Sequence, residues 1–326
     1  MILRLLTFIT LIFVSNIGFA ACDKVGTSNV LDATVQENPF NDAEEGAQDN
    51  CQEIPDFYKV TFYKIALCQS NPYNGSNDFS SCEYILDSST GIPSEMTYAA
   101  SKPLATGDFT IPQGEYPYAM LILNNQIYLK HTQEYDEDIT GYSASASDAA
   151  AKGKFCSTNE QVTTIDNFQG TLPYITTTEA SGDDQTLIGM VCSDTAETAQ
   201  YASEIIDNIC HTEDNCGNTS SLTTNFNAVA PDADLDRSQT GGVANIKLLQ
   251  IDNATTATSR GDARRILYTI AFTSPMNVTG ENDQYDIAFN ISGSVSVDHT
   301  FANDRIYAQK VGAEMFSAIF TVTNTP

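Results

Sequence analysis

Residues Tyr285 to Val297 read YDIAFNISGSVSV, and every second residue in this stretch is apolar or glycine. Between them lie polar residues and one alanine, Ala288. Because successive side chains of a β-strand point to opposite faces, this alternation predicts a strand with one buried and one wet face. The pattern is longer than a typical strand of about 5–6 residues, so Gly293 is expected to mark a bend or a bulge. A half-buried antiparallel sheet is the element that the sequence predicts best.

Further apolar runs predict strands on both sides of this stretch. In the C-terminal part the candidates are residues 243–251, 266–273, 305–308 and 316–323. In the N-terminal part they are residues 57–68, 82–86 and 107–111, followed by 116–123, which Asn124-Asn125 is expected to turn into 126–131 as a hairpin. Strands without intervening helices favour antiparallel sheets that pack face to face. The expected fold class is mainly β: two antiparallel β-sandwich domains, immunoglobulin-like or transthyretin-like, with one short helical segment between them.

The helical segment is predicted from residues 195–209. Asp194 can cap its first turn and Glu197 follows three residues later, as in a capping box. The apolar residues of its stripe are Ala199, Ala202, Ile205, Ile206 and Ile209. The domain plan that follows is a signal peptide at 1–20, a polar N-terminal arm at 21–55, a first β-domain at 56–131, a linker at 132–155, a disulfide-braced segment with the helix at 156–218, and a second β-sandwich domain at 219–326.

The N-terminus carries the pattern of a secretory signal peptide. Arg4 precedes an apolar run that ends in Gly18-Phe19-Ala20, a small–x–small cleavage site. The mature chain is therefore expected to be secreted, at the cell surface or in the periplasm, with no transmembrane segment. A lipoprotein anchored through Cys22 is the lesser alternative, because Phe19 is a poor match to a lipobox.

Eight cysteines follow the expected signal peptide, and an even number in an exported chain indicates disulfides. Lipidation of Cys22 would leave an odd number, which also favours ordinary cleavage. The spacing does not determine the connectivity, so nearest-neighbour pairing is the simplest expectation. The expected pairs are Cys22–Cys51, Cys68–Cys82, Cys156–Cys192 and Cys210–Cys216.

The chain is strongly acidic, with 42 Asp and Glu against 15 Lys and Arg and a net charge of −27. Such a charge repels nucleic acid, which is excluded as a partner, and attracts cations. The alternating carboxylates Asp232, Asp234 and Asp236 are the candidate Ca²⁺ ligands, because Ca²⁺ prefers oxygen donors. Arg237 stands where an EF-hand needs glycine, so the expected site is a looser one or an ordinary acidic loop.

Part of the first β-domain resembles a known group of proteins. The matching features are Tyr58-Lys59-Val60-Thr61, the Ala66-Leu67-Cys68 segment closed by Cys82, and Ile111-Pro112-Gln113-Gly114-Glu115-Tyr116 before a long apolar strand. Over residues 58–129 the chain resembles a loose group of uncharacterised secreted β-sandwich proteins of marine bacteria. The resemblance implies an extracellular β-sandwich and carries no function over.

Motifs for catalysis are missing from the sequence: there is no Gly-x-Ser-x-Gly, no HExxH and no P-loop. We therefore assign no catalytic residue and no cofactor apart from the candidate Ca²⁺, and expect a protein that is not an enzyme. The leading hypothesis is a secreted or cell-surface structural protein, a self-assembling filament or layer subunit. The alternative is an extracellular β-sandwich module that binds carbohydrate or another ligand, with or without Ca²⁺, in which Tyr116, Tyr118 and Tyr128 could stack on sugar rings. A hydrolase with a pair of catalytic carboxylates is the third hypothesis.

Overall fold

The structure is a computed structural model, and it is mainly β with antiparallel sheets. None of its described segments is a helix long and apolar enough to cross a bilayer. The described residues are 21–33, 50–98, 100, 109–141, 152–158, 190–206, 228, 242–280, 283–302, 305–313 and 316–323. The strands are β1 (Asn50–Glu53), β2 (Phe57–Cys68), β3 (Cys82–Met96), β4 (Gly114–Asn124), β5 (Gln126–Lys130), β6 (Thr132–Gly141), β7 (Lys152–Thr158), β8 (Met190–Ser193), β9 (Ala202–Ile205), β10 (Gly242–Leu249), β11 (Arg265–Val278), β12 (Gln284–Asn290), β13 (Val295–Ala302), β14 (Arg305–Ala313) and β15 (Ser317–Thr323), with the 3-10 turn η2 (Arg260–Asp262) before β11.

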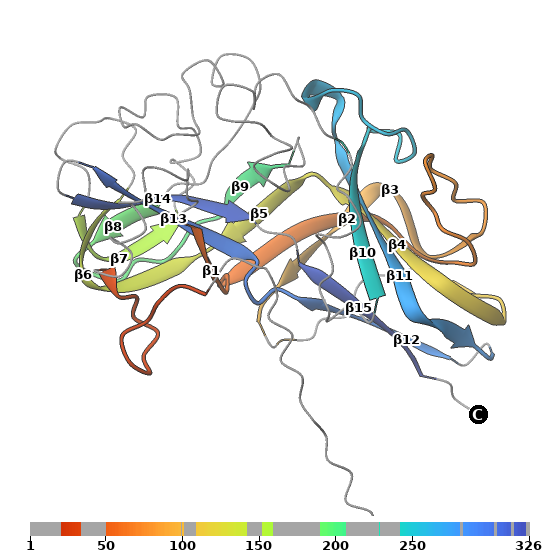
Figure 1. Ribbon diagram of the computed structural model, residues 1–326, viewed down its shortest axis with the longest axis horizontal. Helices are drawn as coiled ribbons and strands as arrows, with labels where there is room; N and C mark the ends of the chain where they lie inside the picture. Colours follow the sequence, from red (N-terminus) through yellow and green to blue (C-terminus); the bar gives the residue numbers. More distant parts are fainter. Residues whose placement is uncertain are drawn as a thin grey trace, which may run out of the picture.

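The larger sheet is built around β2. Its strand order is β10-β11-β4-β2-β5-β9, and β3 also pairs with β2. A strand has only two edges, so β3 occupies one edge of β2 while β4 and β5 share the other, one after the other. Figure 1 shows the long ribbons of β2, β4 and β11 at one end of the molecule.

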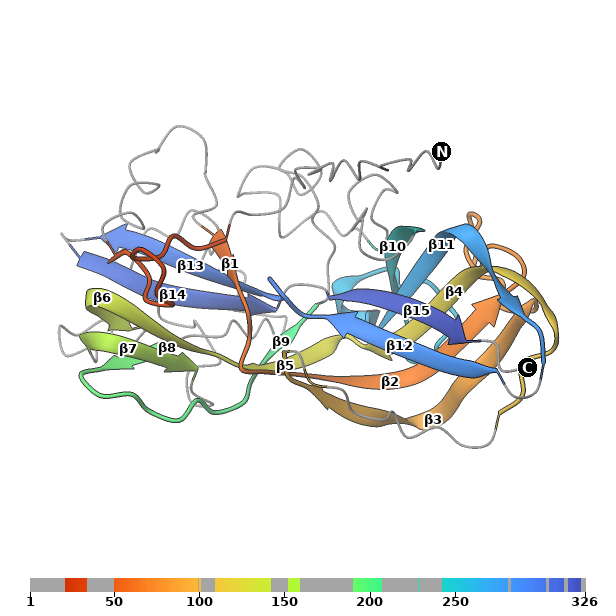
Figure 2. The same ribbon diagram turned by 90° about the horizontal axis from the view of Figure 1, so that it is seen from below.

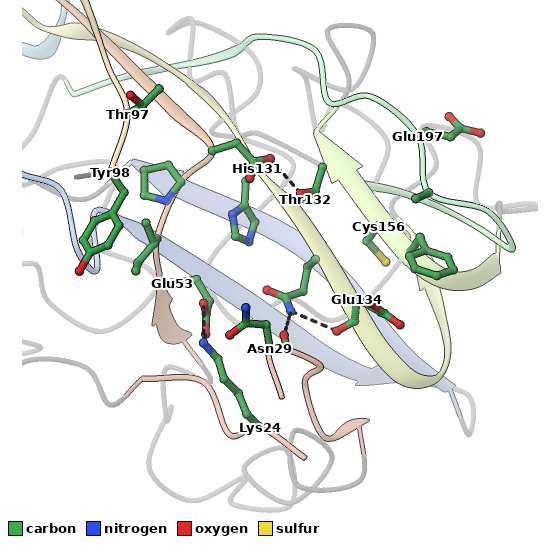
Figure 3. Close-up of a pocket in the computed structure, with 16 residues that line it drawn as sticks. Lys24, Asn29, Glu53, Thr97, Tyr98, His131, Thr132, Glu134, Cys156 and Glu197 are labelled. Atoms are coloured by element: carbon green, nitrogen blue, oxygen red, sulfur yellow. Dashed lines mark hydrogen bonds and ion pairs between the residues drawn. The ribbon is translucent and has the colours of Figure 1, made fainter. Parts of the chain in front are cut away.

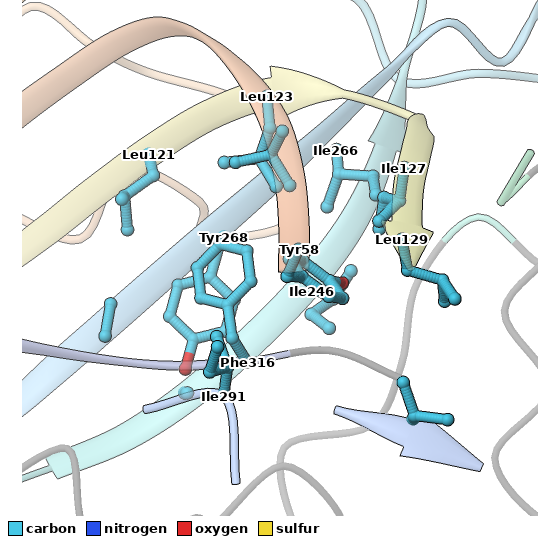
Figure 4. Close-up of a cluster of buried hydrophobic side chains, with 14 of the residues drawn as sticks. Tyr58, Leu121, Leu123, Ile127, Leu129, Ile246, Ile266, Tyr268, Ile291 and Phe316 are labelled. Carbon is cyan, nitrogen blue, oxygen red and sulfur yellow. The ribbon is translucent and has the colours of Figure 1, made fainter. Parts of the chain in front are cut away.

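One face of this sheet is covered by the two-stranded β12–β15 sheet (Figure 2). The contact is aromatic: Phe316, which is fully buried, has its ring centroid 5.1 Å from Phe289 and 5.9 Å from Tyr58. Phe62 stacks on Phe289 at 5.2 Å. Figure 4 shows Phe316 among the side chains that the larger sheet contributes to this core. Rings at these separations add specific attraction to the burial of apolar area.

The opposite face of the larger sheet carries a second, smaller core. Met120 and Ile122 of β4 and Leu267 of β11 are fully buried there. The loop between Cys68 and Cys82 lies against the connection between β10 and β11, where the Asn77 side chain donates hydrogen bonds to the Ala254 carbonyl and the Thr256 hydroxyl. Loops therefore bury the face that period-2 alternation alone would leave wet.

The second sheet has the order β1-β13-β14-β6-β7-β8 and lies at the other end of the molecule (Figures 1 and 2). All its neighbours are antiparallel except β14 and β6, which are parallel. The larger sheet contains strands from both expected β-domains, because β11 pairs with β4, and the second sheet joins β13 and β14 of the expected second domain to strands from the expected arm, linker and disulfide-braced segment. The sheets are thus not divided as the ranges 56–131 and 219–326 divide the chain.

The alternating stretch Tyr285 to Val297 is strand on both sides of a break. Tyr285, Ile287 and Phe289 pack on the core from β12, while Val295 and Val297 are buried in β13 of the other sheet. Between them Gly293 has φ +74°, and an added Cβ would lie 2.8 Å from the Gln52 side-chain oxygen. The expected bend at Gly293 is confirmed, and it passes the chain from one sheet to the other.

The hairpin expected at Asn124-Asn125 is wrong. β4 and β5 do not pair with each other but follow one another along β2, Leu123 opposite Phe62 and Tyr128 opposite Lys59. Asn-Asn is a frequent turn signal, but here it lies at a branch of the sheet where β11 pairs with β4 and β9 pairs with β5. The buried side chain of Asn125 donates to the carbonyls of Ala263 (3.1 Å) and Ile206 (3.2 Å) and ties the two branches together.

The helix predicted at 195–209 is also wrong for its described part, residues 195–206. Residues 195–201 form neither helix nor strand, and β9 follows, with Ala202 opposite Leu129. Ala199 and Ala202 are buried, so the apolar stripe serves packing, although not as a helix. Backbone pairing with β5, which is remote in sequence, outweighs a local helical pattern.

The expected arm and linker contain ordered structure as well. Leu31 and Ala33 are fully buried, and the Leu31 amide donates to the Glu134 carbonyl at 2.9 Å, so this part of the arm packs on β6. Residues 132–155 were expected to link two domains but include β6 and the start of β7. Tyr135 and Ile139, both buried, supply the apolar contacts that the acidic composition of this segment conceals.

Three of the four expected disulfides are present: Cys22–Cys51, Cys68–Cys82 and Cys156–Cys192. Because the Cys22 sulfur is joined to Cys51, it is not available for a lipid anchor. The expected pair Cys210–Cys216 and the expected signal peptide at 1–20 lie outside the described residues.

Candidate functional site

His131 lies at the point where the chain leaves one sheet for the other. It is the single residue between β5 of the larger sheet and β6 of the second sheet. Its backbone is held in place, since its amide donates to the Thr158 hydroxyl at 3.2 Å and its carbonyl accepts from the Thr158 amide at 3.0 Å. Thr158 in turn donates its hydroxyl to the Gln200 carbonyl at 2.8 Å. The backbone of His131 is thus tied to β7 of the second sheet at the point where β5 of the larger sheet ends.

The imidazole of His131 is buried, with 2% of the residue exposed. Neither ring nitrogen has a hydrogen-bond partner of good geometry in the described part of the chain. Burial, which penalises the charged ring, lowers the pKa of His131 to about 4, although the Asp56 carboxylate, the Ile54 backbone and the Gln133 side chain oppose the shift. The ring is therefore neutral near pH 7 and offers one donor and one acceptor.

A cavity of about 670 Å³ lies against this ring (Figure 3). Strands β1, β6 and β7 of the second sheet contribute to its wall, together with the N-terminal segment, the residues just before β2 and those just after β3. The side chains that matter below are His131, Lys24, Glu53, Asp56, Asn29 and Tyr98. A cavity with a few convergent polar groups is a common form of small-molecule site.

Charged groups form one side of the cavity. The Lys24 ammonium lies 3.1 Å from both carboxylate oxygens of Glu53, which is itself buried on β1. The Cys22–Cys51 disulfide holds the backbone on either side of this pair. Asp56 accepts a hydrogen bond from the Thr132 hydroxyl at 2.9 Å, and its amide donates to the Lys130 carbonyl at 2.9 Å. These carboxylates are held by the fold before any ligand arrives.

The rim of the cavity carries an exposed aromatic ring. Tyr98, just after β3, is 57% exposed. Inside the rim, Gln133 donates from its amide to the carbonyls of Glu134 (3.1 Å) and Asn29 (3.4 Å). The cavity therefore combines an aromatic edge with a fixed polar interior.

The sequence-based candidates do not meet at this cavity. The expected Ca²⁺ ligands Asp232, Asp234 and Asp236 lie outside the described residues. Tyr116 is fully buried and donates its hydroxyl to the Pro112 carbonyl at 2.8 Å, so it packs in the core. The other two candidate sugar-stacking rings, Tyr118 and Tyr128, are half-buried, and Tyr128 lies under the Lys59 ammonium. Within the described ranges no three His, Cys, Asp or Glu side chains gather as metal ligands would.

Sequence reasoning missed His131 because it looked for spacing between histidines. The signal that was present is alternation: Ile127, Leu129, His131, Gln133 and Tyr135 are all buried, so His131 occupies an inward position of a buried run. A lone inward histidine is not distinctive in sequence, and its neighbours Lys24 and Glu53 are remote along the chain.

Comparison with known proteins leaves the site to be argued from its own geometry. No family model, no curated protein and no solved structure matches the chain. The resemblance of residues 58–129 to secreted β-sandwich proteins stays a prediction.

Proposed function

We propose that this chain is an exported β-sandwich protein that binds a carbohydrate-like ligand in the His131 cavity. The observation that carries the proposal is the buried, neutral imidazole beside a cavity, since neither ring nitrogen has a hydrogen-bond partner of good geometry in the described part of the chain. Buried polar atoms are almost always satisfied, and an exception calls for a partner that the protein itself does not supply. The three disulfides support an oxidising compartment outside the cytoplasm.

The chemistry of the cavity favours a polyhydroxylated ligand. A sugar hydroxyl both donates and accepts, which suits a neutral imidazole that presents one donor and one acceptor. The Glu53 and Asp56 carboxylates are further acceptors for hydroxyl groups, and Lys24 is a donor. Tyr98 at the rim is placed to stack on the apolar face of a sugar ring. Carboxylates on the wall disfavour an anionic ligand at this site.

The proposal can be tested with the histidine resonances of the protein. The chain contains three histidines, so the imidazole proton signals are few and that of His131 is assigned from a His131→Leu variant. A glycan array selects the ligand, and titration with it is expected to shift the His131 signal. The Tyr98→Ala variant is expected to weaken binding about tenfold through the loss of stacking.

A matched control is Ile251→Ala, since Ile251 is 69% exposed and does not line the cavity. It should bind like the unaltered protein. The proposal is contradicted if no neutral glycan binds, or if binding leaves the His131 resonance in place while Tyr98→Ala and Ile251→Ala behave alike.

A structural role is the second candidate. In the described part of the chain β15 pairs only with β12, and a strand edge of that kind can recruit another chain. Donation of the N-terminal arm is not the favoured mode, because Leu31 already packs on β6 of its own chain. Light scattering over a range of concentrations tests this role: assemblies that grow with concentration support it, and a constant monomer mass refutes it.

A further inference from the structure

The wall of the His131 cavity carries more negative charge than its single ammonium balances (Figure 3). Four carboxyl groups and one lysine line the cavity, which gives the wall a formal charge of −3 while His131 is neutral. The carboxyl groups are those of Glu53, Asp56, Glu134 and Glu197, and the lysine is Lys24. Because the whole chain has a net charge of −27, its field adds to that of the wall and favours positively charged ligands over anionic ones.

The ammonium of Lys24 is already engaged inside this wall. It lies 3.1 Å from both oxygens of Glu53, which is the one buried residue among the four acidic ones. The other three acidic residues of the wall are exposed, and in the described part of the chain none of them forms an ion pair with a lysine, arginine or histidine. The unbalanced negative charge is thus on the exposed part of the wall, where an entering ligand can reach it.

Asp56 is the carboxyl group that acts on the imidazole. Burial lowers the pKa of His131, and the Asp56 carboxylate is the strongest of the influences that oppose this shift. The carboxylate is held in place, because it accepts a hydrogen bond from the Thr132 hydroxyl at 2.9 Å. The imidazole, on a residue that is 2% exposed, has no hydrogen-bond partner of good geometry among the described residues. A fixed carboxylate and a buried imidazole that calls for a partner therefore belong to one cavity.

The arrangement of these groups suits an organic cation. In the described ranges no three His, Cys, Asp or Glu side chains gather as metal ligands would, so the negative charge is spread along the wall. The neutral imidazole has one donor and one acceptor, which a hydroxyl group satisfies. The exposed ring of Tyr98 at the rim can attract both the apolar face of a sugar and a cation. A sugar ring that carries a protonated amine meets all of these conditions.

We propose that the His131 cavity selects protonated amino sugars, with the ammonium of the ligand at Asp56 and its hydroxyl groups at His131. This inference rests on the proposed function, since it names the class of carbohydrate that the same cavity takes. Exchange of the amine for a hydroxyl group, as in glucose, removes the charge and keeps the ring. A neutral sugar therefore binds in the same place but more weakly.

Separate titrations of the unaltered protein with glucosamine and with glucose test the proposal, with the imidazole resonance of His131 as the readout. At about pH 6 the amine is protonated, while His131, with a pKa of about 4, is neutral. Glucosamine is expected to bind about tenfold more tightly than glucose, through a charge-assisted hydrogen bond. Raising the salt concentration from about 0.05 M to about 0.5 M should reduce this preference, because salt screens exposed charges.

Asp56→Asn removes the charge and keeps an oxygen that can accept from Thr132. It should weaken the binding of glucosamine about fivefold more than that of glucose. Asp286→Asn is the matched control, since Asp286 is an exposed aspartate on β12 that does not line the cavity. It removes the same charge from the chain and should leave both affinities unchanged.

The outcomes separate this proposal from the one on which it rests. If glucose binds as tightly as glucosamine, or more tightly, and shifts the His131 resonance, the selection of amino sugars is refuted and the binding of carbohydrate stands. If no glycan shifts that resonance, both are refuted. Equal effects of Asp56→Asn and Asp286→Asn on the binding of glucosamine would also overturn the role of Asp56.

Discussion

Asn125 and His131 lie on the same run of chain, one at each end of β5, and both are buried polar residues, but the fold treats them differently. The Asn125 side chain donates to two carbonyls that belong to the two branches of the larger sheet. The His131 ring, at the junction between the two sheets, faces a cavity, and among the described residues its nitrogens have no hydrogen-bond partner of good geometry. The comparison separates a polar group that the structure uses internally from one that it leaves for a ligand.

Asn125→Leu is the substitution with the largest expected effect. It removes the donors of the buried Ala263 and Ile206 carbonyls, and two unsatisfied buried acceptors should lower the free energy of unfolding by about 4 kcal/mol. Urea unfolding measures this loss. Asn124→Ala is the control, because the half-buried Asn124 only accepts from the Gln126 amide, and it should cost less than about 1 kcal/mol. Equal losses from the two variants would show that Asn125 is not the tie between the branches.

Acidification, through protonation of His131, has the next largest expected effect on the free energy of unfolding. Its pKa is about 6.5 in the unfolded chain and about 4 in the folded one, so the unfolded chain takes up the proton first. The contribution of neutral His131 to the free energy of unfolding is therefore fully present above about pH 6.5, and it falls by about 3 kcal/mol as the pH drops to about 4. Urea unfolding between these pH values, compared with His131→Gln, isolates this contribution. An identical pH profile in the variant would contradict it.

Two carboxyl groups act in a lower pH window. Hydrogen bonds from Ser80 lower the pKa of Asp78, and those from Thr255 lower the pKa of Asp252, both from 3.8. A carboxyl with a lowered pKa stabilises the folded state above its unfolded value and loses that contribution below it. Their effect therefore begins where that of His131 ends.

His131→Leu has the smallest expected effect on stability, and it distinguishes a ligand-binding imidazole from a structural one most directly. Replacing an unpartnered buried ring by an apolar side chain of similar length should raise the free energy of unfolding by about 1 kcal/mol or leave it unchanged. At the same time it should abolish binding in the cavity. A large loss of stability would mean that the imidazole is a structural tie like Asn125, and the comparison would fail.

Strands could be predicted from the sequence where apolar and polar residues alternate. Tyr285 to Val297 alternates as expected and bends at Gly293, because side-chain period and glycine geometry are local properties. The partners of each strand were not readable. The segment at 195–206 has a helical spacing, and only the unpaired edge of β5, remote in sequence, makes it extended. Asn124-Asn125 was predicted to be a turn for the same reason, because the carbonyls that the Asn125 side chain binds belong to residues distant in sequence.

The candidate site was harder to foresee for a related reason. His131 is a single residue without any spacing pattern, and it becomes distinctive only through what surrounds it. Composition indicated an acidic exterior and could not indicate which residues would line a cavity.

The interleaving of early and late strands has a consequence for how such a chain can mature. Cysteine pairs join near neighbours and can form as soon as their own segments emerge, but Phe316, just before β15, completes a core that β2 begins. A product truncated before Phe316 would therefore leave Tyr58 and Phe62 without the ring that contacts both of them, whatever disulfides it had formed. Proteases that clear unfinished chains would recognise such a product, and co-expressing the missing C-terminal piece should rescue it.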